Sequence, residues 1–265
     1  MSTALPDERL LAFSAYESAR FGLRVFRGAV GGVDVDTLVR ELENKRVDIA
    51  ILRIASGASD LERALSDRGL HSIAADTLVH YCADLRAHAP AAPASDRLLL
   101  RRCNAGDALR LEAIVRETFD GYTTHYHANP LFTSARILEG YVEWAIRHVL
   151  SNDEGRLAWI IEVDGQDVGF SCVEIAADHS QARGVLNGTL PAYRGHGIYR
   201  RMLRAMLTHF AVEAVPRFVI STQARNVVVQ RVWTAEGLVF ERAESTIHIN
   251  ALLGDGAPEV TAANS

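Results

Sequence analysis

Segments with strand-like and helix-like patterns alternate along almost the whole chain of 265 residues, and this alternation restricts the folds that it can adopt. Strand-like runs cover residues 23–30, 47–55, 77–84, 97–103, 157–176 with a turn at Asp164-Gly165, 183–190, 217–223 and 245–252. Helical patterns cover residues 35–45, 59–69, 105–119, 137–151, a stretch that ends near residue 214, and 227–236. This order predicts an α/β (α+β) fold with a mixed sheet.

Composition excludes several classes of protein. Hydrophobic residues make up 48% and charged residues 23% of the chain, as in ordinary folded proteins. The net charge of −5 argues against nucleic acid or an anionic membrane surface as a partner. No run approaches the roughly 20 apolar residues that a membrane span needs. The three cysteines, Cys82, Cys103 and Cys172, lack metal-ligand spacing and are expected to be buried thiols in a reducing cytoplasm.

The chain is expected to contain two domains. Residues 86–96 combine three prolines with small residues and are typical of a linker. The linker separates a smaller α/β domain (1–85) from a larger domain (97–255), and residues 256–265 are expected to form a flexible tail. Gly69 to Leu85 aligns without a gap on Gly237 to Leu253. This match indicates either a duplicated strand-helix-strand unit or a common helix-Gly-strand junction.

A turn with two glycines links a strand-like run to a helix-like run in the sequence "YRGHGIY", residues 193–199. Gly195 and Gly197 allow backbone N–H groups to approach a ligand, and the positive end of a helix dipole favours a phosphate there. Arg194 adds a charged donor. A dinucleotide-binding turn needs a third glycine and a P-loop needs Gly-Lys-Ser/Thr, so neither pattern is present.

The sequences "LNGTLPAYRGHGIYRRMLRAMLTHF" and "VISTQARNVVVQRVWTAEGLVF" resemble the acyl-CoA-binding core of the GNAT superfamily of N-acyltransferases, and the resemblance extends over roughly residues 98–253. It implies a GNAT-type mixed sheet behind a smaller GNAT-like N-terminal domain, acyl-CoA as co-substrate, and no metal. The residues that it implies for CoA binding are Leu190, Arg194, Gly195, His196, Gly197, Ile198, Tyr199, Asn226 and Trp233. Loop amides would hold the pyrophosphate, two splayed strands would seat the pantetheine, and an N–H near Leu190 would polarise the thioester carbonyl.

The sequence "AYESARFGLRV" and the later "STQARN…TAEGLVFERAESTIHIN", with the order of a short α/β unit, a linker and a larger domain, resemble the group of dTDP-fucosamine acetyltransferase and related nucleotide-sugar N-acyltransferases over most of the chain. This narrower resemblance implies transfer of an acetyl or short hydroxyacyl group, such as 3-hydroxybutyryl, to the amine of a dTDP-linked amino-dideoxysugar for surface (lipopolysaccharide) polysaccharide biosynthesis. The partners would be these small molecules, with a homodimer as one assembly. Two alternatives remain open: a GNAT enzyme for another small amine, and a CoA-binding module without catalysis.

Two positions depart from the family pattern. Tyr199 stands where the motif closes with Gly or Ala, and its ring is expected to turn away along the helix. Trp233 stands where many family members carry a tyrosine that protonates the departing thiolate, and an indole N–H delivers no proton at neutral pH. Water or a hydroxyl displaced from that place would then carry the proton. Simple core packing is the other interpretation of Trp233.

Residues 119–132 form the richest cluster of polar and aromatic side chains, and the resemblance implies that this connection lines the acceptor site. We expect a general base, His125 or His127, because an attacking ammonium must first lose a proton; solvent-facing histidines are the alternative. We expect three further residues to lie where thioester and amine meet: Asn187, Thr189 and Gln223. Asn187 and Gln223 are the catalytic candidates among them. The residues expected to bind the acceptor are Asp120, Tyr122, Tyr126, Asn129, Tyr141 and Trp144, although the spacing of the last two equally suits packing.

Overall fold

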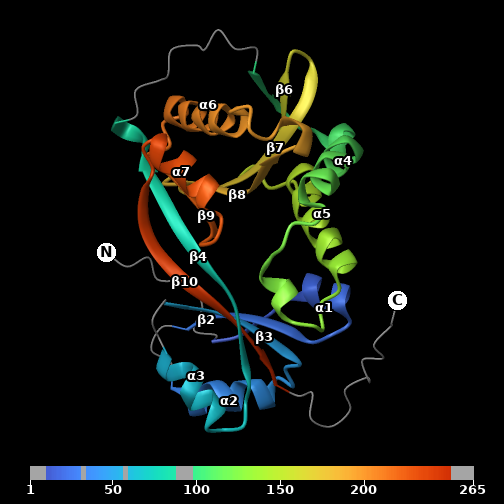
Figure 1. Cartoon of the computed structure of the whole chain (residues 1–265), viewed down its shortest axis with the longest axis vertical. Coiled ribbons are helices and arrows are strands. Elements are labelled where there is room, and N and C mark those ends of the chain that lie inside the picture. Colours follow the sequence, from blue (N-terminus) through green and yellow to red (C-terminus); the bar gives the residue numbers. More distant parts are fainter. Residues whose placement is uncertain (1–9, 31–33, 56–58, 88–97, 252–265) are drawn as a thin grey trace. The chain divides into compact units, whose positions relative to one another are not determined.

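The computed structural model describes residues 10–30, 34–55, 59–87 and 98–251. By its internal contacts the chain divides into two compact units, which Figure 1 shows in sequence colours. Unit 1 comprises Met1–Thr77, His125–Phe132 and Glu244–Ser265, and unit 2 comprises Leu78–Thr124 and Thr133–Ala243. The units are therefore not consecutive in sequence, which differs from the expected division into 1–85 and 97–255.

Two long strands account for this difference. Strand β4 (Ser72–Asp84) begins in unit 1 and ends in unit 2, and β10 (Val239–Asn250) runs from unit 2 into unit 1. A short 3-10 helix, Leu85–Ala87, follows β4 and includes the first residues of the expected linker. The remainder of that linker and the expected tail lie outside the described residues.

Unit 1 is built on a small mixed sheet with strands in the order β1-β2-β3-β10. Its other elements are β1 (Ala12–Phe13), α1 (Ala15–Phe21), β2 (Val25–Val30), α2 (Val35–Asn44), β3 (Ile49–Ala55), α3 (Ser59–Ser66) and the 3-10 helix η3 (His125–Ala128). β2 and β3 are parallel, and β10 is antiparallel to β3. One sheet face is apolar because Leu52, Ile247 and Ile249 pack against α2 and α3.

Unit 2 carries the larger mixed sheet, with strands in the order β4-β9-β8-β7-β6-β5. Its strands are β5 (Leu98–Arg102), β6 (Arg156–Val163), β7 (Gln166–Ile175), β8 (Ala182–Thr189) and β9 (Arg217–Gln223), besides the ends of β4 and β10. Its helices are η2 (Ala105–Asp107), α4 (Ala108–Phe119), α5 (Ser134–Leu150), η4 (Pro191–Tyr193), α6 (Ile198–Val212) and α7 (Val227–Ala235).

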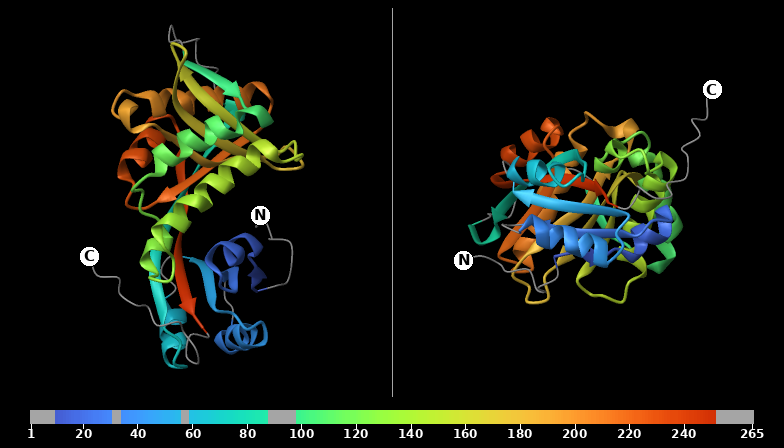
Figure 2. Two further views of the ribbon diagram at one scale, coloured as in Figure 1. Left: turned by 90° about the vertical axis from the view of Figure 1, so that its right-hand side faces the viewer. Right: turned by 90° about the horizontal axis from the view of Figure 1, so that it is seen from below.

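Helices cover both faces of the unit 2 sheet. Side chains alternate along β6, so that Leu157, Trp159 and Ile161 join the core under α6 and α7, whereas Ala158 and Ile160 join the core under α4 and α5. Figure 2 shows α4 and α5 running side by side. The expected turn at Asp164-Gly165 connects β6 and β7, and both residues have positive φ. The predicted α/β (α+β) class with a mixed sheet is therefore confirmed.

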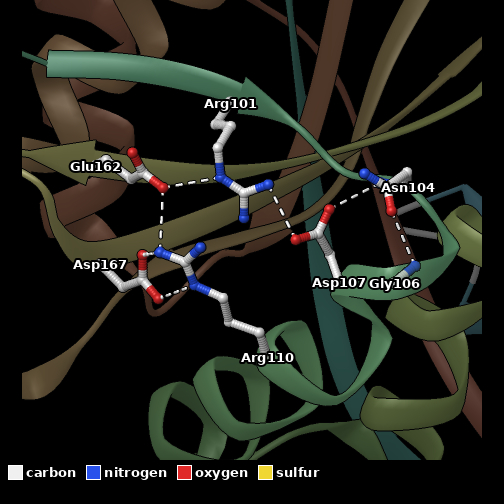
Figure 3. Close-up of polar contacts among 7 residues, drawn as sticks. All are labelled: Arg101, Asn104, Gly106, Asp107, Arg110, Glu162 and Asp167. Carbon is white, nitrogen blue, oxygen red and sulfur yellow. Dashed lines mark hydrogen bonds and ion pairs between the residues drawn. The ribbon is translucent and has the colours of Figure 1, made fainter.

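A network of charged side chains fastens the first elements of unit 2 to the β6–β7 hairpin (Figure 3). Arg101 of β5 binds Asp107 at 2.9 Å and Glu162 of β6 at 2.8 Å. Arg110 of α4 bridges the same Glu162 and Asp167 of β7. The arginines therefore hold β5 and α4 at the edge of the sheet, where each carboxylate satisfies more than one donor.

The cysteines need one correction. Cys172 is buried as expected, but Cys82 and Cys103 are only partly buried, and all three are free. Among the described residues, no helix combines the length and the apolar character that crossing a bilayer requires.

A close backbone approach between β7 and β8 gives the first prediction. A Cβ at Gly169 would lie 2.4 Å from the Gly188 carbonyl oxygen, so Gly169→Ala should force the strands apart and lower the free energy of unfolding by about 1–3 kcal/mol. Urea denaturation measures the change. Gly106→Ala is the control, because its Cβ would meet only the side-chain oxygen of Asn104, at 3.1 Å. Equal losses in the two variants would contradict the prediction.

Candidate functional site

The turn that precedes α6 presents backbone donors with no partner in the described part of the chain. Gly195 and Gly197 have φ of +82° and +71°, and the N–H groups of Gly195, His196 and Gly197 donate to no acceptor there. Because α6 begins at Ile198, the positive end of its dipole lies at the same place. His196 is exposed. The turn is thus suited to a phosphate group.

The side chain of Arg194 ties this turn to α4. Its Nη2 donates to the Thr118 carbonyl oxygen at 2.9 Å, one residue before the last residue of α4. Thr118 also lies close to β8, because a Cβ at Gly188 would approach its Cγ2 to 2.6 Å. The carboxyl end of α4 therefore supports both the turn and the end of β8.

Strands β8 and β9 separate beside the turn. They are parallel and pair only at Ala182 with Phe218, Arg183 with Val219 and Gly184 with Ile220. The later residues of the two strands have no registered pairs with each other, so their carboxyl ends splay apart, as expected. The Leu190 N–H does not face this opening as a free donor, because it donates to the Val168 carbonyl oxygen at 2.9 Å. The Leu190 N–H itself is thus engaged within the sheet, and an oxyanion donor near Leu190 stays a prediction.

Tyr199 joins three elements around the opening. Its hydroxyl donates to Asn187 Oδ1 of β8 and accepts from Trp233 Nε1 of α7, each at 3.0 Å. Its ring packs against the core of unit 2, and Trp233 is almost fully buried in that core. Burial raises the pKa of the Tyr199 hydroxyl well above its usual range, so the phenol stays protonated at neutral pH. The ring thus points into the protein interior rather than along the helix surface.

Gln223, at the end of β9, holds the first part of the loop after α4. Its Oε1 accepts from the Tyr122 hydroxyl at 3.0 Å, and its Nε2 donates to the Thr123 carbonyl oxygen at 3.2 Å. Arg225 donates to the same carbonyl at 2.6 Å. These bonds tie Gln223 to the loop, and its catalytic role stays a prediction. Arg225 is a further contact residue that no sequence pattern singled out, although it lies in the "STQARN" run.

Aromatic rings pack beneath this loop. Tyr141 stacks on Phe119 with 4.7 Å between ring centroids, and Trp144 lies 6.3 Å from Tyr141. Both residues pack against the core under α4 and α5, which favours the packing interpretation of their spacing. The remaining expected site residues lie in different surroundings. Asn226 precedes α7 and donates from Nδ2 to Thr222 Oγ1 at 3.1 Å. Thr189 is buried and Asp120 is exposed.

The second part of the same loop belongs to unit 1. Tyr126 donates its hydroxyl proton to Glu17 and accepts from Arg27 Nη2 at 2.7 Å, while Arg27 Nη2 also binds Glu17 at 2.8 Å. Burial opposes ionisation of Glu17, but the bonds from Arg27 outweigh it and lower its pKa to about 2. Asn129 donates to Asn250 of β10 at 2.8 Å. The cluster expected at one acceptor site is thus divided between the units.

His125 is buried against a second histidine. Its Nδ1 lies 3.0 Å from Nε2 of His248, which has no exposed surface. Burial first, and then the positive charges of Arg27 and Arg53, lower the pKa of both histidines, that of His248 to about 4. Both rings are therefore neutral at pH 7. His127 is exposed, and its role as a base stays a prediction.

No set of three His, Cys, Asp or Glu side chains with the geometry of a metal site occurs among the residues that the structure describes.

Comparisons with known proteins agree with this geometry. Residues 97–239 match the family model described as an acetyltransferase (GNAT) domain. The fold is similar to that of a GCN5-related N-acetyltransferase from Sphaerobacter thermophilus, with a TM-score of 0.59, 14% identity and 90% and 74% of the two chains covered. A conserved protein of unknown function from Staphylococcus epidermidis gives a TM-score of 0.58 at 11% identity, with 92% of each chain covered.

A third similar structure is a glucosamine N-acetyltransferase region of a fungal multi-domain GH3 β-N-acetylglucosaminidase. It gives a TM-score of 0.58 at 10% identity, with 90% of this chain and 30% of that chain covered. At these identities the likeness is one of fold alone. No curated protein sequence matches the chain.

The Tyr199 hydroxyl yields a prediction for stability. Tyr199→Phe leaves the buried indole N–H of Trp233 and the Asn187 oxygen unpaired, which should cost about 1–3 kcal/mol of unfolding free energy. Tyr193→Phe is the matched control, because the Tyr193 hydroxyl has no hydrogen-bond partner among the described residues. Chemical denaturation of the two variants in parallel makes the comparison, and a Tyr199→Phe protein as stable as the control would refute the network.

The buried histidine pair yields a prediction for pH dependence. The unfolded chain binds protons near pH 6.5 whereas folded His248 binds one only near pH 4, so stability is complete above pH 6.5 and falls as the pH drops toward 4. For His248 alone the loss is about 3 kcal/mol. His248→Asn should flatten the profile between pH 6.5 and 4.5, above the range in which Glu17 contributes.

Denaturation curves at several pH values test this, with His127→Asn as the exposed control. If the unfolding free energy of His248→Asn fell with pH as steeply as that of the wild type, the pKa of His248 in the folded protein would not be depressed.

Proposed function

Since this chain belongs to the GNAT acetyltransferase family, which its residues 97–239 match over more than half of its length, we propose that it is an acyl-CoA-dependent N-acyltransferase acting on a nucleotide-linked amino sugar. The proposed acceptor is a dTDP-linked amino-dideoxysugar, and the acyl group is acetyl or a short hydroxyacyl. The proposed setting is surface polysaccharide biosynthesis in the cytoplasm.

The observation that carries the proposal is that the glycine turn before α6 lies next to the separated ends of β8 and β9. The N–H groups of residues 195–197 and the α6 dipole suit the pyrophosphate of CoA. The opening between β8 and β9 begins just past Gly184 and Ile220, where unpaired strand edges can bond the amides of the pantetheine arm. Both features lie in the same unit and are joined by η4, so one extended ligand can use both.

The chemistry in this proposal is direct transfer. The amine nitrogen of the acceptor bonds to the thioester carbon, the carbon–sulfur bond breaks, and CoA leaves as a thiolate. The ammonium loses one proton before attack, to a base or a water molecule, and the nitrogen loses a second proton as the amide forms, which water can pass to the departing thiolate. Cys103 and Cys172 are poor nucleophiles, since burial raises the pKa of both thiols, that of Cys103 to about 11.

Protonation of the thiolate does not need the indole at position 233. Trp233 donates its N–H to Tyr199, and the raised pKa of Tyr199 makes that phenol a poor acid. A thiol pKa near the roughly 8.5 of cysteine makes CoA a fair leaving group, so water suffices as the proton source. In this proposal Tyr199, Asn187 and Gln223 shape the opening instead of exchanging protons.

The choice of acceptor rests on the resemblance to nucleotide-sugar N-acyltransferases and on the aromatic residues beside the opening. Tyr122 bonds Gln223 at the end of β9 and contacts Phe119 edge to face. Such rings stack favourably on a pyranose or a thymine base. Another small amine is the alternative acceptor for the same CoA chemistry.

The test is a thiol-release assay with acetyl-CoA and 3-hydroxybutyryl-CoA against dTDP-3-amino- and dTDP-4-amino-dideoxysugars. We expect release of free CoA with one of these acceptors. Gly195→Val should weaken acyl-CoA binding at least tenfold by calorimetry, because a side chain is strained at φ +82° and blocks the amides. Gly165→Val is the control, since Gly165 has φ +77° in the β6–β7 turn, away from the glycine turn.

Absence of binding by any acyl-CoA would reject the enzyme proposal. Binding of acyl-CoA without thiol release on these sugars, but with release on another small amine, would reject the sugar only. Binding without release on any amine would instead identify a non-catalytic CoA-binding module.

A further inference from the structure

The sheet of unit 1 has one apolar and one polar face. Neighbours across strands point to the same face, and the register aligns Arg27 of β2 with Ile51 of β3 and His248 of β10. The next row on that face, two residues along, consists of Ala29, Arg53 and Thr246. The face opposite the α2 and α3 core thus carries two arginines in adjacent rows.

The charges around the first row balance each other. The Arg27 guanidinium binds both oxygens of Glu17 through Nε and Nη2, and the same Nη2 donates to the Tyr126 hydroxyl. His248 and His125 are neutral at pH 7, as argued above. The row therefore holds one positive and one negative charge, and Nη1 of Arg27 has no partner in the described part of the chain.

In the second row, the positive charge of Arg53 has no ion-pair partner among the described residues. Arg53 is mostly buried, and its hydrogen bond is to the hydroxyl of Thr246, which has no exposed surface. Arg53 forms no ion pair in the described part of the chain, although the charges of Glu244 and Asp76 partly offset its own. Burial, followed by the charge of Arg27, lowers the pKa of Arg53. A cation held in this way is unfavourable unless an anion joins it.

A second polar atom on the same face is also unsatisfied. Nδ1 of His248 is buried and has no hydrogen-bond partner among the described residues, although its Nε2 meets His125. Two residues along β10, Thr246 offers its hydroxyl to Arg53. Buried polar groups are usually hydrogen-bonded, so unpaired polar atoms in two adjacent rows indicate a place where a ligand could bind.

We propose that Arg53, with Arg27 and Thr246, forms a binding site on unit 1 for a diphosphate group. The free donors are Nε and Nη2 of Arg53 and Nη1 of Arg27, a set that suits the several oxygens of a multiply charged oxyanion. The diphosphate would pair with the guanidinium of Arg53, for which no ion pair occurs among the described residues. The ligand class is a diphosphate, either inorganic or carried by a nucleoside, and all three residues belong to unit 1.

The experiment measures binding of inorganic pyrophosphate, dTDP and succinate by calorimetry at constant ionic strength, without acyl-CoA. We expect pyrophosphate and dTDP to bind the wild-type protein and succinate to bind much more weakly. Arg53→Gln should weaken both phosphate ligands by about 10- to 100-fold, because it removes charged hydrogen bonds. Arg63→Gln, on exposed α3, is the matched control and should leave binding unchanged.

A thermal melt without ligand separates this role from a structural one. Arg53→Gln should leave the unliganded melting temperature unchanged or raised, since it removes an uncompensated buried charge, and should abolish the increase that pyrophosphate causes in the wild type. A lowered melting temperature with unchanged pyrophosphate affinity would assign Arg53 to the fold and overturn the proposal.

The remaining outcomes are also decisive. Absence of pyrophosphate binding would overturn the site, and succinate binding as tightly as pyrophosphate would overturn its assignment to a diphosphate. Pyrophosphate binding without dTDP binding would support the anion site and overturn its use by a nucleoside diphosphate. Thiol release on a different amine, with pyrophosphate binding intact, would reject the proposed acceptor without rejecting the site.

Discussion

The pairing of β8 with β9 ends after three residue pairs, and the arrangement of the unit 2 site depends on that limit. Parallel strands that stop pairing expose backbone donors and acceptors that must be satisfied in another way. Tyr199 bridges one side of the opening by bonding Asn187 of β8 and Trp233 of α7. At the other side, Gln223 of β9 fastens the loop after α4. The opening is therefore held by side chains and not by the sheet.

The features that sequence predicted best are those governed by local chemistry. Hydrophobic periodicity located most strands and helices, because each element buries a face with its own period. The glycine turn was recognisable because positive φ at two closely spaced positions has few alternatives to glycine. Helix boundaries moved by only a few residues, as with α5, expected over 137–151 and observed at Ser134–Leu150.

The features that sequence did not predict depend on contacts between distant residues. Tyr199 and Trp233 are 34 positions apart, and nothing local to either residue announces their hydrogen bond. The polar loop after α4 looked like one cluster, yet its first part bonds Gln223 and its second part bonds Glu17 and His248. The sequence did contain a sign of the arginine face, because Arg27 and Arg53 each interrupt an apolar strand run. Without the register of three strands, their shared face could not be inferred.

The pairing of β3 with β10 also has a consequence for how the protein is made. β3 is synthesised early, but its partner residues, Glu244 to Asn250, follow about 190 positions later. The sheet of unit 1 therefore stays incomplete on the ribosome until these residues have emerged. Closing so long a loop is slow, and the edge of β3 that will pair with β10 keeps its backbone groups unpaired meanwhile. The synthesis of β10 therefore sets the earliest time at which this edge is protected from aggregation.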